Sequence, residues 1–131
     1  MPMSGNFLLD TNIVIAMFAD EPSFRERLES NPMLFIPSIV LGELYYGAMA
    51  SSRKEENLRK VNDLARVFVV LNCDARTARR FGEVKNGLRQ KGRPIPENDV
   101  WIAALTLDHN LTLVSRDSHF EAIDGLFLES W

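Results

Sequence analysis

Short apolar runs alternate with stretches of helical periodicity along this chain. The runs FLL, FVVL and LTLV are apolar at nearly every position, a pattern typical of strands that are covered on both faces. We expect strands over residues 6–9, 33–36, 68–71 and 111–115, with a last one over 126–128. We expect helices over residues 11–18, 22–30, 38–51, 53–66, 74–90 and 96–110.

Strands that alternate with helices pair in parallel through right-handed crossovers. We therefore predict an α/β fold, a three-layer sandwich with a parallel sheet of four to five strands flanked by helices. Residues 1–131 are expected to form one domain, because their number is ordinary for a single domain. In such sheets ligands bind beyond the carboxyl ends of the strands, so the residues that follow each strand deserve most weight.

Composition and charge narrow the class of protein. The chain is 46% hydrophobic and 25% charged, which is typical of globular proteins. No apolar run approaches the roughly 20 residues that span a bilayer, and no signal peptide is recognisable at the N-terminus. Cys73 is the only cysteine, so a reducing cytoplasm is the expected location. The net charge of −3 argues against a nucleic-acid binder that relies on bulk positive charge.

Two aspartates follow predicted strands. Asp10 comes directly after FLL, and Asp117 comes after LTLV with Ser115 and Arg116 between. An N-cap or an Asx turn is the usual role of such a residue. If both strands are central and parallel, however, the two carboxylates lie at one edge of the sheet and favour a site.

Glu43 is placed differently, in the middle of the predicted helix SIVLGELYYGA. At about 100° per residue it falls between Ile39 and Val40 on the helical wheel, within the apolar arc. A carboxylate there must be paired, protonated or metal-bound, because burying it alone costs several kcal/mol. Gly42 and Gly47 weaken this helix, which is understandable if another group approaches closely.

The first turn of the predicted helix PENDVWIAALTL contains Asp99. Interaction with the helix dipole and a role in the site are equally good explanations, although Glu97 can serve the dipole alone. Asp99 lies on the side of Ile102 and Ala103 and should face inward. Asp74 is set aside as a helix N-cap.

Carboxylates that converge repel one another and raise each other's pKa, so a fold assembles them where a cation binds. Oxygen ligands suit Mg²⁺ or Mn²⁺, as one ion or two. The two histidines, His109 and His119, lack the spacing of zinc ligands. A cation would also let an acidic protein handle a polyanion, with water as the nucleophile.

Several polar residues accompany the four acids. Thr11, Asn12 and Ser115 could orient the carboxylates or bound water, and capping the next helix is an equally good role for Thr11 and Asn12. Arg93 and Arg116 are candidates for phosphate contacts, although a solvated surface position is the commoner role. Tyr45 is the aromatic residue best placed for contact with a partner protein.

Four segments, FLLDTNIVIA, PSIVLGELYYGA, ENDVWIAALTL and LTLVSRDSHF, resemble in order and spacing the motifs of PIN domains. The resemblance is closest to the toxins of bacterial VapBC-type toxin–antitoxin modules and spans nearly the whole chain. It implies a Mg²⁺- or Mn²⁺-dependent endoribonuclease with Asp10, Glu43, Asp99 and Asp117 as its acids. It also implies an RNA substrate, a homodimer, and a cognate antitoxin that inserts a peptide near the active site.

Other functions compete with this interpretation. A phosphatase with an aspartyl nucleophile also has an aspartate after its first strand, but it needs a second acid where this chain has Asn12. A response-regulator receiver needs an acidic pair near its first strand and a phosphorylatable aspartate directly after its third. This chain has Leu71 and Asn72 at the end of the third strand, and Asp74 comes late. A PIN-like module that binds RNA or protein without cleavage stays open, although the intact set of acids argues against it.

Overall fold

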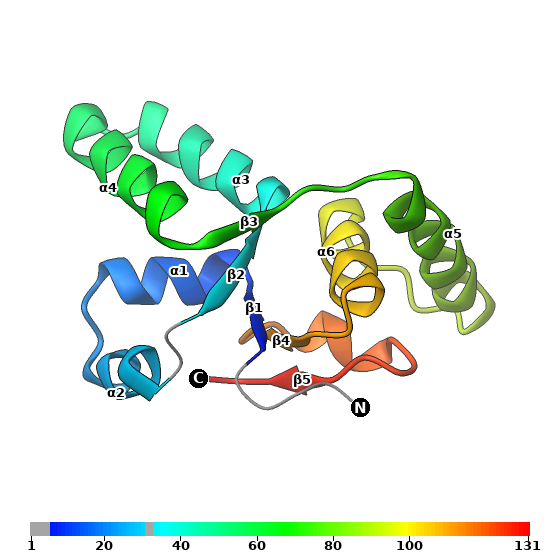
Figure 1. The fold of residues 1–131 in the computed structure, drawn as a ribbon. Helices are drawn as coiled ribbons and strands as arrows, with labels where there is room; N and C mark the ends of the chain where they lie inside the picture. Colours follow the sequence, from blue (N-terminus) through cyan, green and yellow to red (C-terminus); the bar gives the residue numbers. More distant parts are fainter. Residues whose placement is uncertain (1–5, 31–32) are drawn as a thin grey trace.

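The computed structural model describes residues 6–30 and 33–131. Its helices and strands alternate as predicted (Figure 1). In chain order they are β1 (Phe7–Leu9), α1 (Thr11–Phe18), α2 (Pro22–Ser30), β2 (Leu34–Pro37), α3 (Ser38–Met49), α4 (Lys54–Val67), β3 (Val69–Leu71), α5 (Ala75–Gln90), α6 (Glu97–Asp108), β4 (Thr112–Val114), the 3₁₀ helix η1 (Ser118–Ala122) and β5 (Leu128–Glu129).

Within the described residues, five strands form one sheet in the order β3-β2-β1-β4-β5. Neighbouring strands pair in parallel throughout this sheet, with Leu9 of β1 opposite Val114 of β4. The chain moves outward from β1 through β2 to β3, then crosses back to β4 and continues to β5. This reversal places β1 and β4 side by side at the centre, where a ligand crevice is expected beyond their carboxyl ends.

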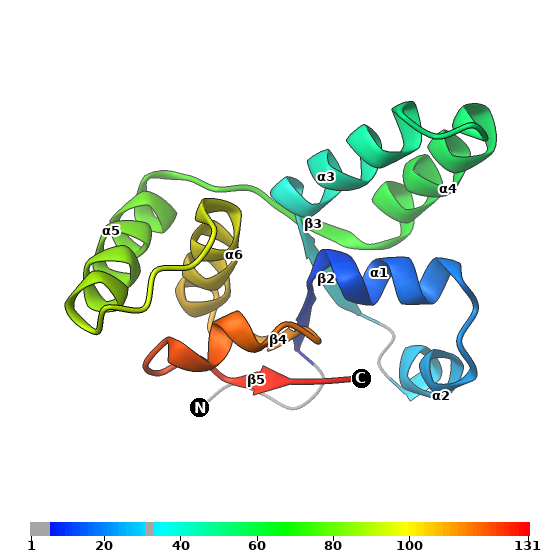
Figure 2. The same ribbon diagram turned by 180° about the vertical axis from the view of Figure 1, so that it is seen from behind.

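The helices cover the two faces of the sheet and complete a three-layer α/β fold, as predicted. Helices α1 to α4 lie on one side of the sheet, and α5, α6 and η1 lie on the other (Figures 1 and 2). The chain changes sides between β3 and α5, because the direction of strand addition reverses there and right-handed crossovers must then use the other face.

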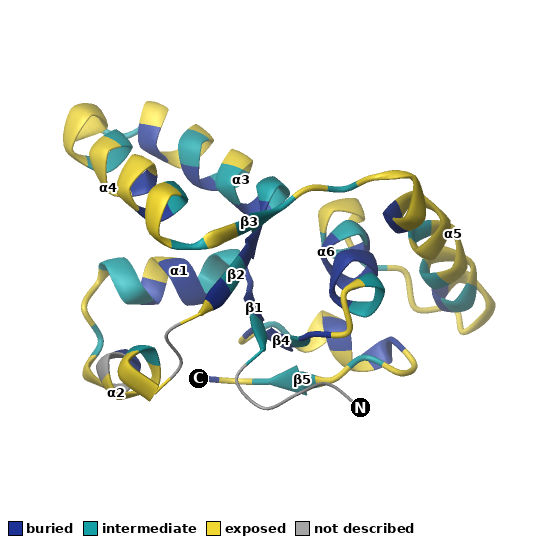
Figure 3. Cartoon of the chain, in the orientation of Figure 1, coloured by how far each residue is buried: buried dark blue, intermediate teal, exposed yellow. Residues whose placement is uncertain are grey.

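Burial follows the central strands. Leu8 and Leu9 of β1 and Leu113 and Val114 of β4 are fully buried, as the all-apolar runs predict. Helix α6 packs against them with nearly its whole circumference buried, whereas α4 and α5 expose their outer faces (Figure 3). The residues that carry the site therefore follow the most deeply buried strands of the sheet.

Three expectations need correction. The run FVVL forms the edge strand β3 and is not covered on both faces, with Val69 38% exposed. The last strand lies at Leu128–Glu129 and shares only Leu128 with the predicted segment. No atom of the described chain lies close to where a Cβ on Gly42 or Gly47 would be, so no close approach within the chain explains these glycines.

Asp74 caps α5, as predicted. Its carboxylate accepts hydrogen bonds from the backbone N–H groups of Arg76 and Thr77, and the Asp74 N–H in turn donates to the Thr77 hydroxyl oxygen. This reciprocal pair satisfies backbone donors at the start of the helix. Over the described ranges, no helix combines the length and apolarity needed to cross a membrane.

Candidate active site

Asp10 is the most buried of the four acids, with 5% of its surface exposed. It follows β1 directly, and its N–H bonds the carbonyl of Val114 on β4 at 3.0 Å. Its side chain caps α1 by accepting from the Thr11 N–H at 2.8 Å. Its other oxygen accepts from the Ser115 hydroxyl at 2.7 Å and from the Asn12 amide at 3.2 Å. The carboxylate is thus held in one orientation.

Glu43 projects from α3 towards Asp10 and α6. Its two oxygens accept from the Thr11 hydroxyl at 2.8 Å and from the Asn98 amide at 3.2 Å. The predicted burial within the apolar arc is wrong, because Glu43 is only half-buried and the next turn exposes Tyr46 and Gly47. Glu43 lies beside the buried stripe of α3 and lines a groove that this helix forms with α1 and α4.

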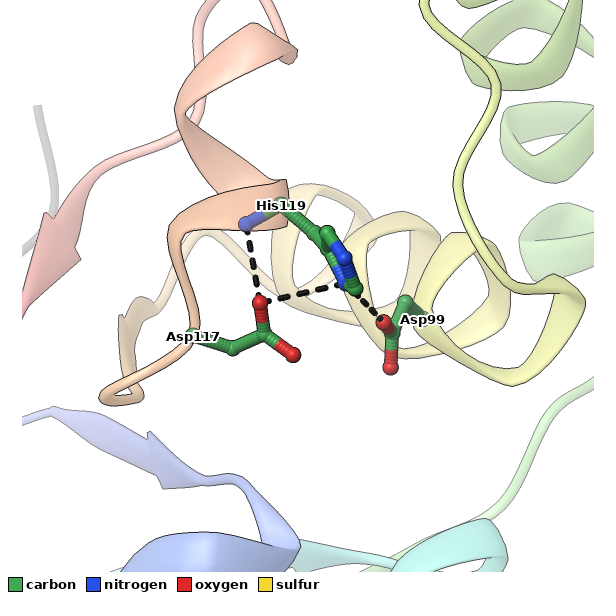
Figure 4. A group of neighbouring side chains, drawn as sticks. All are labelled: Asp99, Asp117 and His119. Atoms are coloured by element: carbon green, nitrogen blue, oxygen red, sulfur yellow. Dashed lines mark hydrogen bonds and ion pairs between the residues drawn. The ribbon is translucent and has the colours of Figure 1, made fainter.

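Asp99 and Asp117 lie close to each other on a second side of the site, away from Glu43's contact with Thr11. Asp99 lies in the first turn of α6 with its side chain 16% exposed, and Asp117 precedes η1 with its side chain 33% exposed. The Nδ1 atom of His119 lies between them, 3.2 Å from Asp99 Oδ2 and 3.1 Å from Asp117 Oδ1 (Figure 4). Ser115 connects this side to Asp10, because its oxygen also accepts from the Asp117 N–H at 3.0 Å.

Electrostatics links the acids of this cluster. Burial raises the pKa of the Asp10 carboxyl, and the charges of Asp99 and Glu43 raise this pKa further, against hydrogen bonds from Ser115 and Thr11. Burial likewise raises the pKa of Asp99, to which the charges of Asp117 and Glu43 add, while His119 opposes the shift. The fold therefore brings all four predicted acids to one place, where they repel one another.

Residues 7–126 of the chain match the family model described as PIN domain. The chain belongs to the PIN-domain family.

Curated relatives place this PIN-domain protein in the VapC branch. Ribonuclease VapC2 of Rickettsia felis is 35% identical over 130 residues, covering 95% of this chain and 97% of the relative. A Shigella flexneri protein named tRNA(fMet)-specific endonuclease VapC is 36% identical over 128 residues, with the same coverage. The resemblance drawn from the four sequence motifs is thereby confirmed.

Solved structures agree with this assignment. DNA-bound VapBC from Salmonella typhimurium superposes with a TM-score of 0.91 at 33% identity, covering 96% of this chain and 98% of that one. VapBC2 from Rickettsia felis, bound to a DNA fragment from its promoter, gives 0.88 at 36% identity, covering 95% and 98%. The predicted parallel α/β fold is therefore the fold of these PIN-domain relatives.

The donor set of this PIN-domain site fits a hard divalent cation. Among the side chains that the structure describes, no lysine or arginine forms an ion pair with any of the four acids. Clustered carboxylates without a basic partner repel one another, and oxygen donors are the ligands that Mg²⁺ and Mn²⁺ prefer. The residues present are thus compatible with one or two such ions.

Some of the polar residues expected beside the acids contact them in the structure, and others do not. Thr11, Asn12 and Ser115 all contact the site acids, and Asn12 also accepts from the Arg116 N–H at 3.1 Å. The guanidinium of Arg116 instead donates to the Trp131 carbonyl at 2.8 Å and to Glu21, which favours a structural role over phosphate contact. Arg93 is exposed in the loop before α6.

Sequence reasoning missed two residues of the site and misplaced one aromatic residue. His119 was judged only by zinc spacing, although its position two residues after Asp117 could have signalled its proximity. Asn98 gave no signal, because its contact with Glu43 depends on how α3 and α6 face each other. Tyr45 donates to Asn62 at 2.6 Å and packs on the core, whereas its neighbour Tyr46 is 77% exposed.

Proposed function

We propose that this chain is a divalent-metal-dependent endoribonuclease and the toxin of a type II toxin–antitoxin pair. Its ribonuclease relatives support the activity, and the convergence of four carboxylates supports the dependence on metal. Asp10, Glu43, Asp99 and Asp117 would hold Mg²⁺ or Mn²⁺, as one ion or two. When bound, the cation supplies a water of lowered pKa and neutralises charge on the leaving oxygen of the phosphodiester.

The hydrogen bonds of the chain prepare the carboxylates for this task. Ser115 and the Thr11 N–H fix Asp10 from two sides, and the Thr11 hydroxyl fixes Glu43. Such contacts orient metal ligands and typically change affinity or activity by about 10–100-fold when they are removed. The low exposure of Asp10, and its engagement through both oxygens, disfavour the aspartyl-nucleophile phosphatase.

The RNA substrate is proposed from the named relatives. The proteins of Shigella flexneri and Salmonella typhimurium, 36% and 35% identical, are named tRNA(fMet)-specific endonucleases. Initiator transfer RNA is therefore the first substrate to test, beside ribosomal and messenger RNA.

A cognate antitoxin is the proposed protein partner. A groove of about 220 Å³ between α1, α3 and α4 reaches Glu43 at the site, and its lining includes Ile15, Phe18, Leu44 and Lys60. An amphipathic antitoxin segment fits such a groove, because its apolar side chains can be buried close to the acids. A homodimer belongs to the same proposal, in line with the toxins that the sequence resembles.

Purified protein should be incubated with initiator transfer RNA and total RNA in Mg²⁺, in Mn²⁺ and in EDTA. We expect cleavage only with a metal, and a loss of at least about 10²–10³-fold in Asp10→Asn and Glu43→Gln, because each removes a charged ligand. Glu83→Gln is the matched control, since this exposed acid lies on α5 and forms its ion pairs in the described structure with Arg79 and Arg80.

Cleavage that survives EDTA would contradict the role of the metal. Folded protein that binds RNA but cuts none of the substrates would favour the non-catalytic module. Circular dichroism of each variant separates loss of chemistry from loss of structure, which matters most for the buried Asp10.

A further inference from the structure

His119 lies with Asp99 and Asp117 on the more exposed side of the site, called here the open side. Asp99 reaches it from α6 and Asp117 from the segment before η1, so separate parts of the chain converge on one imidazole nitrogen (Figure 4). The candidate donor atoms of Asp99, Asp117 and His119 all lie within 4.8 Å of one another. The chain thus brings together a nitrogen donor and two oxygen donors.

The backbone of His119 is firmly held. Its N–H donates to Asp117 Oδ1 at 2.9 Å, as the first bond of the η1 cap. The next residue, Phe120, is 1% exposed and anchors η1 in the core. The imidazole itself is about half exposed, at 48% of its side-chain surface. It is therefore fixed at its base and open to solvent at the ring, as a ligand of an exchangeable cation must be.

The distances fit coordination. Adjacent ligands of an octahedral cation with bonds of about 2.1 Å lie about 3.0 Å apart. Nδ1 of His119 lies 3.1 Å from Asp117 Oδ1 and 3.2 Å from Asp99 Oδ2, close to that spacing. A neutral imidazole has at most one hydrogen on Nδ1, which two carboxylates would have to share. A cation satisfies both carboxylates and the ring nitrogen together.

We propose that His119 is a nitrogen ligand, through Nδ1, of the cation that Asp99 and Asp117 also bind, and that it makes this site prefer Mn²⁺ over Mg²⁺. The proposal rests on the metal-dependent function proposed above. Both ions bind carboxylate oxygens, but Mg²⁺ is a hard ion that takes oxygen ligands, whereas Mn²⁺, although the weakest binder of the first-row transition metals, also accepts nitrogen donors. An imidazole in the site therefore adds more to Mn²⁺ binding.

The test compares the wild type, His119→Ala and the matched control His109→Ala, which removes the only other histidine, exposed at the far end of α6. Electron spin echo envelope modulation of bound Mn²⁺ detects a directly coordinated nitrogen. Calorimetric titration with Mn²⁺ and with Mg²⁺ gives both affinities, and RNA cleavage is measured on the same samples.

We expect nitrogen modulation in the wild type and in His109→Ala but not in His119→Ala. The Mn²⁺ dissociation constant should rise about tenfold or more in His119→Ala, with a change below about threefold for Mg²⁺. Bound Mn²⁺ without nitrogen modulation in the wild type would overturn the proposal, even if His119→Ala failed to fold. Equal Mn²⁺ affinity in wild type and His119→Ala would also overturn it.

The two proposals fail in different ways. Wild type that cleaves RNA with metal but lacks nitrogen modulation keeps the nuclease function and loses the histidine ligand. Wild type that binds Mn²⁺ through His119 but cleaves no RNA keeps the ligand and loses the nuclease function.

Discussion

The two sides of the site are built differently. On the buried side, formed by Asp10, Thr11, Asn12 and Ser115, the carboxylate accepts hydrogen bonds through both oxygens. On the open side, formed by Asp99, Asp117 and His119, Asp99 Oδ1 and Asp117 Oδ2 accept no hydrogen bond from the described residues.

This difference separates two tasks. Hydrogen bonds on the buried side fix the direction of a carboxylate before any ligand arrives, at the expense of burying a charge. The open side keeps unshared oxygens near solvent, where a cation, its waters and a phosphate can exchange. Substitutions on the buried side should therefore affect folding and chemistry together, whereas those on the open side should affect metal binding more than folding.

Of the three substitutions below, Ser115→Ala should have the largest effect on stability. Its hydroxyl donates to Asp10 Oδ2 and accepts from the Asp117 N–H, so its loss loosens the connection between the two sides. The free energy of unfolding should fall by about 1–3 kcal/mol, because a buried carboxylate loses a donor. Cleavage should fall by about 10–100-fold. Urea denaturation and cleavage assays measure the two effects.

Ser118→Ala is the control for that experiment, since Ser118 is exposed in η1 nearby. If the two serine variants behaved alike in both assays, the buried side would not depend on its hydrogen bonds in the way described.

Asp99→Asn should have an intermediate effect, and one that raises stability. In EDTA at pH 7 its melting temperature should exceed that of the wild type by roughly 2–5 °C, because a repelled carboxylate becomes neutral. The rise in melting temperature that Mg²⁺ or Mn²⁺ gives the wild type should disappear. Differential scanning calorimetry with and without metal measures both, and a lower melting temperature in EDTA would instead favour a role at the helix dipole.

The pH dependence of that difference has a definite sign. The folded-state pKa of Asp99 is raised, first by burial and then by neighbouring acids. Its contribution to stability is therefore fully present below the unfolded pKa of about 3.9 and is lost as pH rises through the folded pKa. The stabilisation of Asp99→Asn over the wild type should accordingly grow between about pH 4 and pH 7 in EDTA.

Asp74→Ala should have the smallest effect and the opposite sign. Hydrogen bonds from Thr77 hold the pKa of this exposed acid below its usual range. Its stabilising contribution is present above the unfolded pKa and disappears as pH falls through the lowered one. We expect a slightly lower melting temperature at pH 7, with cleavage and metal affinity unchanged. A change in either would mean that the α5 cap is coupled to the site.

Particular residues show how far the sequence could be used. The apolar runs predicted the central strands, and parallel topology then placed Asp10 and Asp117 at one edge. The position of Glu43 on its helix singled it out as a candidate. The prediction that it is buried was wrong, because a helical wheel gives the direction of a side chain and not what lies opposite. The edge position of β3 was missed for a similar reason, since Val69 reads like a core residue until the strand order is known.

The sequence by itself determined the elements, the parallel α/β class and the four acids, because these depend on local periodicity and on residues next to strand ends. Only the tertiary structure decided that His119 lies between Asp99 and Asp117, that Asn98 contacts Glu43, and that Arg116 bonds Glu21 and Trp131. Apart from the Asp117–His119 pair, these contacts join residues distant in the chain. Their distances follow from how helices and loops pack on the sheet, which local patterns do not specify.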